Sequence, residues 1–221
     1  MEWRARESLF GMQARTSLAV RSTETVAVEI IEGPRSCWSF RPHFHAGDET
    51  VHVREGRARL RLPSGDRPVG AGDVVVVPAG VIHRFEPVDE QGWAFVSEFR
   101  PLPAADERRA DSAGDGLGVR AKTLLADRES LQTDVEAIAE ACAVSAGYLS
   151  RVFRRETGTS LHHFHVLLAL QKAKSLLKQG APLVEAALDA GFYDQAHLTR
   201  EFVKTLGMTP GTFRSAWIDI A

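Results

Sequence analysis

Residues 136–158 read EAIAEACAVSAGYLSRVFRRETG, and residues 185–207 read EAALDAGFYDQAHLTREFVKTLG. The two stretches align without a gap at an offset of 49 residues, which is the difference between Glu136 and Glu185. A pattern that returns at a fixed spacing indicates an internal duplication. Each copy has the pattern of a helix, a tight turn and a second helix. The C-terminal half is therefore predicted to be all α, with two helix-turn-helix units.

The second helix of each copy has two distinct sides. Leucine and phenylalanine recur four residues apart on one side, as Leu149 and Phe153 do in the first copy. Arg151 and Arg200 occupy equivalent positions away from that apolar side. An arginine on a helix in the major groove can bond bidentately to guanine, which supplies roughly 1 to 3 kcal/mol of discrimination. The pattern therefore predicts two DNA-reading helices.

The alternative is a helical bundle whose surface arginines are merely solvated. Acidic residues nearly balance the basic ones in this half, so the domain is not basic overall. Five basic residues nevertheless fall on the two second helices, where they can meet bases or phosphates. They are Arg151, Arg154, Arg155, Arg200 and Lys204. Repetition of the whole pattern favours DNA binding.

Capping residues predict where the helices begin and end. The predicted starts are Thr133 with Glu136 as a capping box, Ser145, Ser160, Asp194, and Thr209 before Pro210. The predicted stops are Gly158, Gly180 and Gly207.

Leu131 to Trp217 resembles the DNA-binding domain of the AraC family of bacterial transcription regulators, and GFYDQAHLTREFVKTLGMTPGTFR (Gly191 to Arg214) is close to that family's signature. The resemblance implies one long helix, at about Leu161 to Gln179, that holds both readers in successive major grooves. It also implies base contacts from Gly147, Tyr148, Ser150 and Arg151 in the first reader and from Gln195, Ala196, His197 and Arg200 in the second, with Thr199 on the same free face. Glycine has no side chain and alanine has only a methyl group, so neither residue can discriminate well between bases. Arg151, His197 and Arg200 are therefore expected to dominate specificity.

Three histidines, His162, His163 and His165, cluster at the start of that linking helix. His162 and His165 have a spacing that a metal site could use, but no Cys or carboxylate lies nearby at ligand spacing. We interpret the cluster as surface histidines or as contacts to the DNA backbone.

The N-terminal half is predicted to be β structure from Ser17 to Phe99. Its segments are short, β-branched or alternating, and are bounded by Gly, Pro and Asp. They are SLAVRS (17–22), TVAVEII (25–31), TVHVREG (50–56), ARLRL (58–62) and DVVVVP (73–78). The stretch from Pro101 to Gly118 is rich in Ala, Asp, Gly and Arg, as linkers are. We predict a β domain at 1–100, a linker at 101–118 and the DNA-binding domain at 119–221.

The segment RPHFHAGDE, Arg41 to Glu49, places two histidines one residue apart and a carboxylate four residues further on. Alternate side chains of a strand share a face, so His43, His45 and Glu49 can point the same way unless a bulge intervenes. The sequence therefore allows these side chains to converge.

This segment and GDVVVVPAGVIHRF (Gly72 to Phe85) resemble the two signature motifs of the cupin superfamily. The resemblance implies a small antiparallel barrel or jelly roll that acts as the sensor domain, with a divalent metal held by His43, His45, Glu49 and His83. Such a ligand set suits Zn, Ni, Fe, Co or Mn, and leaves coordination positions for an effector or water. The alternative is an empty barrel whose histidines bond to Glu49 or to water.

Several aromatic residues lie close to these motifs in sequence. They are predicted to wall an effector pocket, although aromatic residues in a small barrel are also ordinary core. They are Trp38, Phe40, Phe85, Trp93 and Phe95.

Composition narrows the class of protein. With 44% apolar residues, 25% charged residues and a net charge of −2, the chain of 221 residues fits neither a disordered nor a fibrous class, nor a protein that coats nucleic acid nonspecifically. No run approaches the roughly 20 apolar residues that cross a bilayer, and Met1 to Val20 is unlike a secretory signal. Cys37 and Cys142 provide no disulfide framework. A cytoplasmic protein without membrane partners is expected.

The sequence thus predicts a regulator, an activator or a repressor, whose cupin domain binds a metal and a small effector that modulates binding to operator DNA. RNA polymerase and a second copy of the chain are further partners that this role allows. The rival hypothesis is a metal-dependent cupin enzyme. We expect no enzyme, because a free-standing enzyme has no use for a duplicated DNA-binding half. A third hypothesis is a sensor for which the metal ion itself is the signal.

Overall fold

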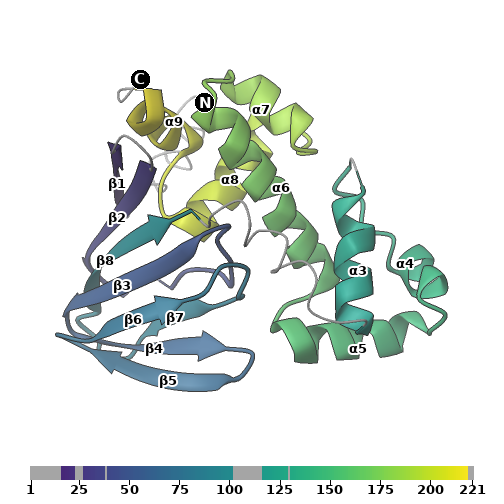
Figure 1. Ribbon diagram of the computed structural model, residues 1–221, viewed down its shortest axis with the longest axis horizontal. Helices are drawn as coiled ribbons and strands as arrows, with labels where there is room; N and C mark the ends of the chain where they lie inside the picture. Colours follow the sequence, from purple (N-terminus) through teal and green to yellow (C-terminus); the bar gives the residue numbers. More distant parts are fainter. Residues whose placement is uncertain (1–15, 23–26, 38, 102–115, 129, 219–221) are drawn as a thin grey trace, which may run out of the picture.

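In the computed structural model, β-strands form one side of the molecule and α-helices the other (Figure 1). The structure describes residues 16–22, 27–37, 39–101, 116–128 and 130–218. Most of the predicted linker and Trp38 of the predicted pocket lie outside these ranges. The strands are β1 (Ser17–Ser22), β2 (Ala27–Ser36), β3 (Asp48–Glu55), β4 (Arg57–Leu62), β5 (Gly65–Gly70), β6 (Val74–Val77), β7 (Arg84–Pro87) and β8 (Trp93–Arg100).

The strands form two antiparallel sheets, as the predicted cupin barrel or jelly roll requires. One sheet has the order β1-β2-β8-β3-β6 and the other β5-β4-β7. Side chains alternate between core and solvent: Val75 and Val77 of β6 are buried, whereas Val74 and Val76 are exposed. Each of the five segments predicted as strands overlaps a strand, with differences of one residue at some ends, while residues 25–26 lie outside the described ranges. The central strand β8 had not been singled out, although its residues alternate between buried and less buried from Phe95 to Arg100.

The described helices are α3 (Leu117–Ala126), α4 (Val135–Ala141), α5 (Ala146–Thr157), α6 (Leu161–Lys178), α7 (Leu183–Asp189), α8 (Gln195–Leu206) and α9 (Pro210–Ile218). The fold class is therefore as predicted, with α4–α5 and α7–α8 as the two helix-turn-helix units and α6 as the long helix between them. Ser145, Ser160 and Asp194 cap their helices through their side chains. Gly158 and Gly207 end α5 and α8 in the left-handed conformation, with φ of 76° and 75°.

The predicted capping box at Thr133 was wrong. Asp134 is the N-cap of α4, and its carboxylate accepts a hydrogen bond of 2.9 Å from the Ala137 N–H. The Thr133 hydroxyl lies instead 3.0 Å from Nδ1 of His165 on α6, one residue before the N-cap.

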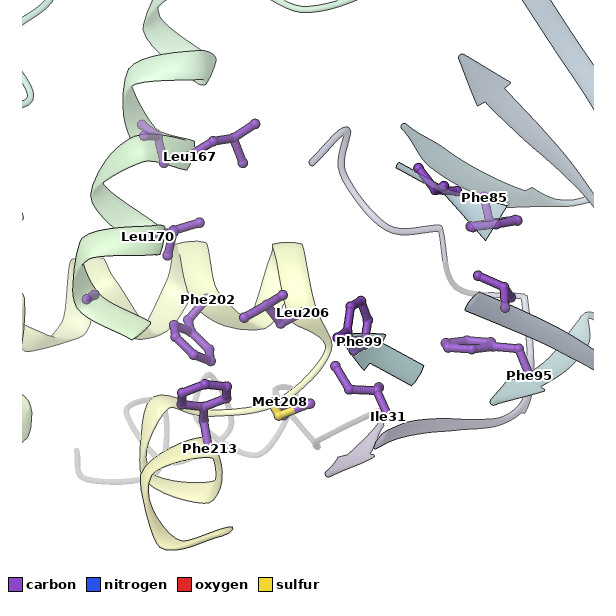
Figure 2. Close-up of a cluster of buried hydrophobic side chains, with 14 of the residues drawn as sticks. Ile31, Phe85, Phe95, Phe99, Leu167, Leu170, Phe202, Leu206, Met208 and Phe213 are labelled. Atoms are coloured by element: carbon purple, nitrogen blue, oxygen red, sulfur yellow. The ribbon is translucent and has the colours of Figure 1, made fainter. Parts of the chain in front are cut away.

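The hydrophobic core is continuous from the β domain into the helical domain. In Figure 2, Leu206 of α8 lies beside Phe99 of β8 and Ile31 of β2, with Phe202 and Phe213 on the side away from Phe99. The buried apolar side chains of α6 from Val166 onward belong to the same cluster, whereas Leu161 and Phe164 belong to a second one within the helical domain. Within the described part of the chain, no helix is long and apolar enough to cross a membrane.

Candidate metal centre and DNA-reading helices

The side chains of His43, His45, Glu49 and His83 converge inside the β domain, and all are buried. One ring nitrogen from each of the three histidines lies within 4.8 Å of the others. Oε2 of Glu49 lies 2.8 Å from Nε2 of His83 and 3.5 Å from Nε2 of His45. The residues before β3 do not form a continuous strand. His43 instead forms an isolated antiparallel bridge with His83, and this bridge brings the two motifs together.

Backbone carbonyls orient two of the histidine rings. Nδ1 of His43 lies 2.7 Å from the Arg41 carbonyl oxygen, and Nδ1 of His83 lies 3.0 Å from that of Val81. Each ring thus donates its Nδ1 proton outward, which leaves the Nε2 lone pair directed inward. Histidines that bind metals are held in the same way.

With this tautomer, the inward-facing lone pairs of the histidines and of Glu49 have no proton or cation between them. A neutral His83 that donates from Nδ1 has no proton on Nε2 to share with Glu49, although those atoms lie 2.8 Å apart. Both ring nitrogens of His45 are buried and lack a hydrogen-bond partner among the described residues. Either a second proton on His83 or a metal cation would satisfy these lone pairs. The histidine triad could therefore hold a metal ion.

Burial and neighbouring charges set the protonation of the site. Burial, followed by the charge of His83, lowers the pKa of His43 to about 3. Burial and the other two histidines lower the pKa of His45 well below 6.5. Burial alone would raise the pKa of Glu49, but the hydrogen bond and charge of His83 outweigh it and lower that pKa. Burial would lower the pKa of His83, but Glu49 outweighs it and raises that pKa. The site thus offers two neutral imidazoles, from His43 and His45, one carboxylate, and the His83 imidazole, which would lose its shared proton to a metal; imidazoles and carboxylates are ligands of divalent transition metals.

The cavity beside these side chains is small. Its volume is about 20 Å³, which holds about one water-sized group. Phe40, Phe85, Trp93 and Phe95 line it as predicted. Trp93 also stacks between Phe85 and Phe95, with ring centroids 5.0 and 4.6 Å away, so these aromatic residues are core as well as wall.

Five further lining residues were missed: Ile31, Ser97, Phe99, Thr205 and Leu206. Ser97 and Phe99 continue the alternation of Phe95 along β8, and this period of two could have identified them. No sequence signal identifies Thr205 and Leu206, because they reach the cavity from helix α8 of the other domain.

The two candidate DNA-reading helices present the predicted polar side chains to solvent. The apolar residues of α5 and α8 are buried, whereas most of the predicted contacts are exposed. The exposed ones are Gly147, Tyr148, Ser150, Arg151, Arg154, Arg155, Gln195, Ala196, Arg200 and Lys204. His197 and Thr199 are only half-buried. The His197 ring packs against Phe192, and the Thr199 hydroxyl donates to the Gln195 carbonyl.

The interpretation of the α6 histidines as surface groups was wrong for two of them. His165 is buried against Thr133, and Nε2 of His163 lies 2.7 Å from the Pro42 carbonyl oxygen of the β domain. His162 is exposed. Helix α6 packs against the segment before α4 and against the β domain, and the rings of His165 and His163 take part in these two contacts.

The segment that carries two of the candidate metal ligands also contacts the helical domain. The Arg41 guanidinium donates to the Glu201 carboxylate of α8 at 2.8 Å. The Phe44 ring stacks on Phe164 of α6 with centroids 5.6 Å apart, and its carbonyl accepts a 2.9 Å hydrogen bond from Gln171. These contacts were not predicted, because the partners are more than a hundred residues apart in sequence.

Comparison with known proteins agrees with this two-part architecture. The helix-turn-helix domain family matches residues 138–216, and the cupin domain family matches residues 31–95. The HTH-type transcriptional regulator RipA of Corynebacterium glutamicum is 32% identical over 120 residues, which cover 54% of this chain and 33% of that protein. The arabinose operon regulatory protein of Escherichia coli is 30% identical over 83 residues, which cover 37% of this chain and 28% of that protein. The matches thus span about a third of the length of such relatives.

A solved structure shares the fold across both domains. Unsaturated fatty acid bound ToxT from Vibrio cholerae superposes with a TM-score of 0.57 at 10% identity, covering 91% of this chain and 99% of that one. At this identity the likeness concerns the fold alone. The chain therefore combines an AraC-type helix-turn-helix domain with an N-terminal cupin domain, and its relatives in sequence include transcriptional regulators.

Proposed function

We propose that this chain is a sequence-specific DNA-binding regulator of transcription that reads an operator with α5 and α8. One observation carries the proposal: the duplicated helix-turn-helix unit exposes an arginine at the same position of both second helices, Arg151 and Arg200. Helix α6 packs into the shared core and so provides a rigid mount for both units. Related proteins that are named as transcriptional regulators support the same role.

The second part of the proposal is that His43, His45, Glu49 and His83 bind a divalent transition metal. Support comes from the burial of all four side chains, the two Nδ1 contacts to backbone carbonyls and the unpaired nitrogens of His45. When bound, the ion would supply positive charge and open coordination positions. A small effector in the adjoining cavity would then modulate DNA binding.

Selection from a random duplex library tests DNA reading. The full-length chain should enrich a sequence with two half-sites about 10 base pairs apart, because the readers would occupy successive major grooves. A variant with both Arg151→Ala and Arg200→Ala should lose the enrichment, whereas Arg67→Ala, on exposed β5, should keep it. Enrichment of no sequence by the wild type, or of the same sequence by the double variant, would contradict the proposal.

A sensor of the metal ion itself is a second candidate, and the buried four-residue site favours it. Metal added to chelator-treated protein should then restore affinity for the selected duplex without any organic ligand. An effector mechanism requires the organic ligand as well. An enzyme is less well supported, because the cavity of about 20 Å³ admits only a substrate of very few atoms beside the four side chains.

A further inference from the structure

The last turn of the second DNA-reading helix closes the candidate metal site. Thr205 and Leu206 of α8 line the same cavity as His43, His45 and Glu49. Both are buried, and Figure 2 shows Leu206 directed at Phe99 of the β domain. One wall of the cavity in the sensor domain therefore belongs to the DNA-binding domain.

The β domain holds this end of α8 by its backbone. The final carbonyls of a helix have no partner within the helix. Here the Lys204 carbonyl accepts from the Arg41 N–H at 3.4 Å, and the Leu206 and Gly207 carbonyls accept from the hydroxyl and N–H of Thr16 at 2.8 and 3.3 Å. Hydrogen bonds to the β domain thus hold the residues before and after Thr205, and they fix its position at the cavity.

The Thr205 hydroxyl is buried and has no hydrogen-bond partner among the residues that the structure describes. Helical threonines usually bond to the carbonyl four residues earlier. Thr157 and Thr199 do so, at 2.7 and 2.8 Å. An unsatisfied buried hydroxyl costs free energy, so we expect the Thr205 hydroxyl to find its partner in a ligand of the cavity that Thr205 lines.

The internal duplication gives a comparison within the same chain. The position equivalent to Thr205 in the first unit is Glu156, which is exposed and accepts a hydrogen bond from the Gly118 N–H. The helix-turn-helix scaffold therefore does not itself require a buried threonine here. The threonine is specific to the unit that closes the cavity.

We propose that the Thr205 hydroxyl donates a hydrogen bond to a small oxyanion, such as a short carboxylate, that occupies the cavity beside the metal. This inference rests on the proposed metal centre. A divalent ion held by three imidazoles and one carboxylate would keep a net positive charge, which favours an anion. The small volume restricts the anion to few atoms. The helix that carries Arg200 thereby contacts the effector directly.

The test uses full-length protein loaded with Co²⁺ and titrated with formate, and the visible spectrum of the ion is the readout. The isosteric variant Thr205→Val should bind Co²⁺ in the same ratio as the wild type but formate about tenfold more weakly, the change expected for a lost hydrogen bond to a charged group. Thr205→Ser, which keeps the hydroxyl, should restore most of the affinity. Thr123→Val is the control, because that hydroxyl is exposed and bonded to its own helix.

The outcomes separate this inference from the proposed function. Failure of the wild type to bind Co²⁺ would overturn the metal centre. Normal Co²⁺ binding with equal formate affinity in wild type and Thr205→Val would overturn only the role of Thr205. Because coupling between sites is reciprocal, formate should also change the affinity for the selected duplex in the wild type, and Thr205→Val should reduce that change. An equal change in both proteins would also contradict the inference.

Discussion

At the scale of single residues, the candidate metal centre depends on which nitrogen of each histidine faces inward. His43 and His83 are each fixed by a backbone carbonyl two residues earlier in the chain. His45 has no such contact, and both of its ring nitrogens are unpaired among the described residues. A metal would therefore change the surroundings of His45 most.

Replacing His45 with Ala should lower metal affinity by more than the roughly 10- to 100-fold that loss of an outer-shell partner costs. The reason is that the change removes a candidate ligand and not only its support. Elemental analysis after dialysis against limiting metal measures the effect. His52→Ala, on the same sheet but away from the cavity, is the matched control. Equal metal content in His45→Ala and wild type would place the site elsewhere.

Replacing Arg200 with Ala should weaken specific DNA binding by roughly 1 to 3 kcal/mol and relax the preference at one base position, because a bidentate contact to guanine would be lost. Repeating the duplex selection with the variant measures both effects. Arg214→Ala serves as a control, because that guanidinium donates to the Gly180 carbonyl and lies outside the reading helix. An unchanged base preference would remove Arg200 from the set of base contacts.

At the scale of elements, two short segments join the domains. Helix α8 presents Arg200 to solvent and Thr205 to the cavity. The segment from Arg41 to His45 also contacts both domains, since His43 and His45 face the cavity while Arg41 and Phe44 contact the helical domain. Both histidines adjoin Phe44, which contacts α6, and Arg41, two residues before His43, contacts α8. These elements are suited to coupling the two sites.

Replacing Phe44 with Ala should lower the free energy of unfolding by roughly 1 to 2 kcal/mol, because the ring is half-buried against Phe164. Urea unfolding measures the loss, and hydrogen exchange of the α6 amides tests its location. Phe44→Leu, which keeps most of the apolar contact, should lose less. If Phe44→Ala unfolded at the wild-type midpoint, the stacked pair would not stabilise the contact between the domains.

At the scale of the whole molecule, a buried ion cluster spans the two domains. The Glu29 carboxylate of β2 lies 3.3 Å from the Lys174 ammonium and 2.5 Å from that of Lys178, both on α6. Burial alone would raise the pKa of Glu29, but the charges and hydrogen bonds of the two lysines outweigh it and lower that pKa. Burial also lowers the pKa of Lys178 in spite of Glu29, but Lys178 is partly exposed, so the direction at Glu29 governs the pH dependence.

The cluster predicts how stability depends on pH. A carboxyl group whose pKa is lower in the folded state contributes stability above its unfolded pKa, and this contribution is lost as the pH falls through the folded value. The free energy of unfolding of the wild type should therefore drop below about pH 4.5, the ordinary value for Glu. Glu29→Gln should be less stable at neutral pH, by at most roughly 3 to 5 kcal/mol, because two partly buried ammonium groups lose their partner.

Unfolding measured from pH 7 down to pH 3 tests this prediction. The difference between wild type and Glu29→Gln should narrow in acid. Glu32→Gln, exposed on the same strand, provides the control and should follow the wild-type curve. A constant difference at all pH values would show that the ionisation of Glu29 does not contribute.

The sequence by itself determined the features that depend on local periodicity and on motifs. The duplicated helix-turn-helix pattern, the alternating strands, most helix ends and the four candidate metal ligands all follow from residues close together in the chain. Only the tertiary structure decided how the domains meet. Thr16 bonds to Leu206 across 190 residues, Thr205 closes the cavity, and Thr133, which had been predicted as a cap, contacts His165 of α6 while Asp134 caps α4. Such contacts arise when two surfaces pack together, and no periodic pattern in either segment of sequence identifies the segment that it contacts.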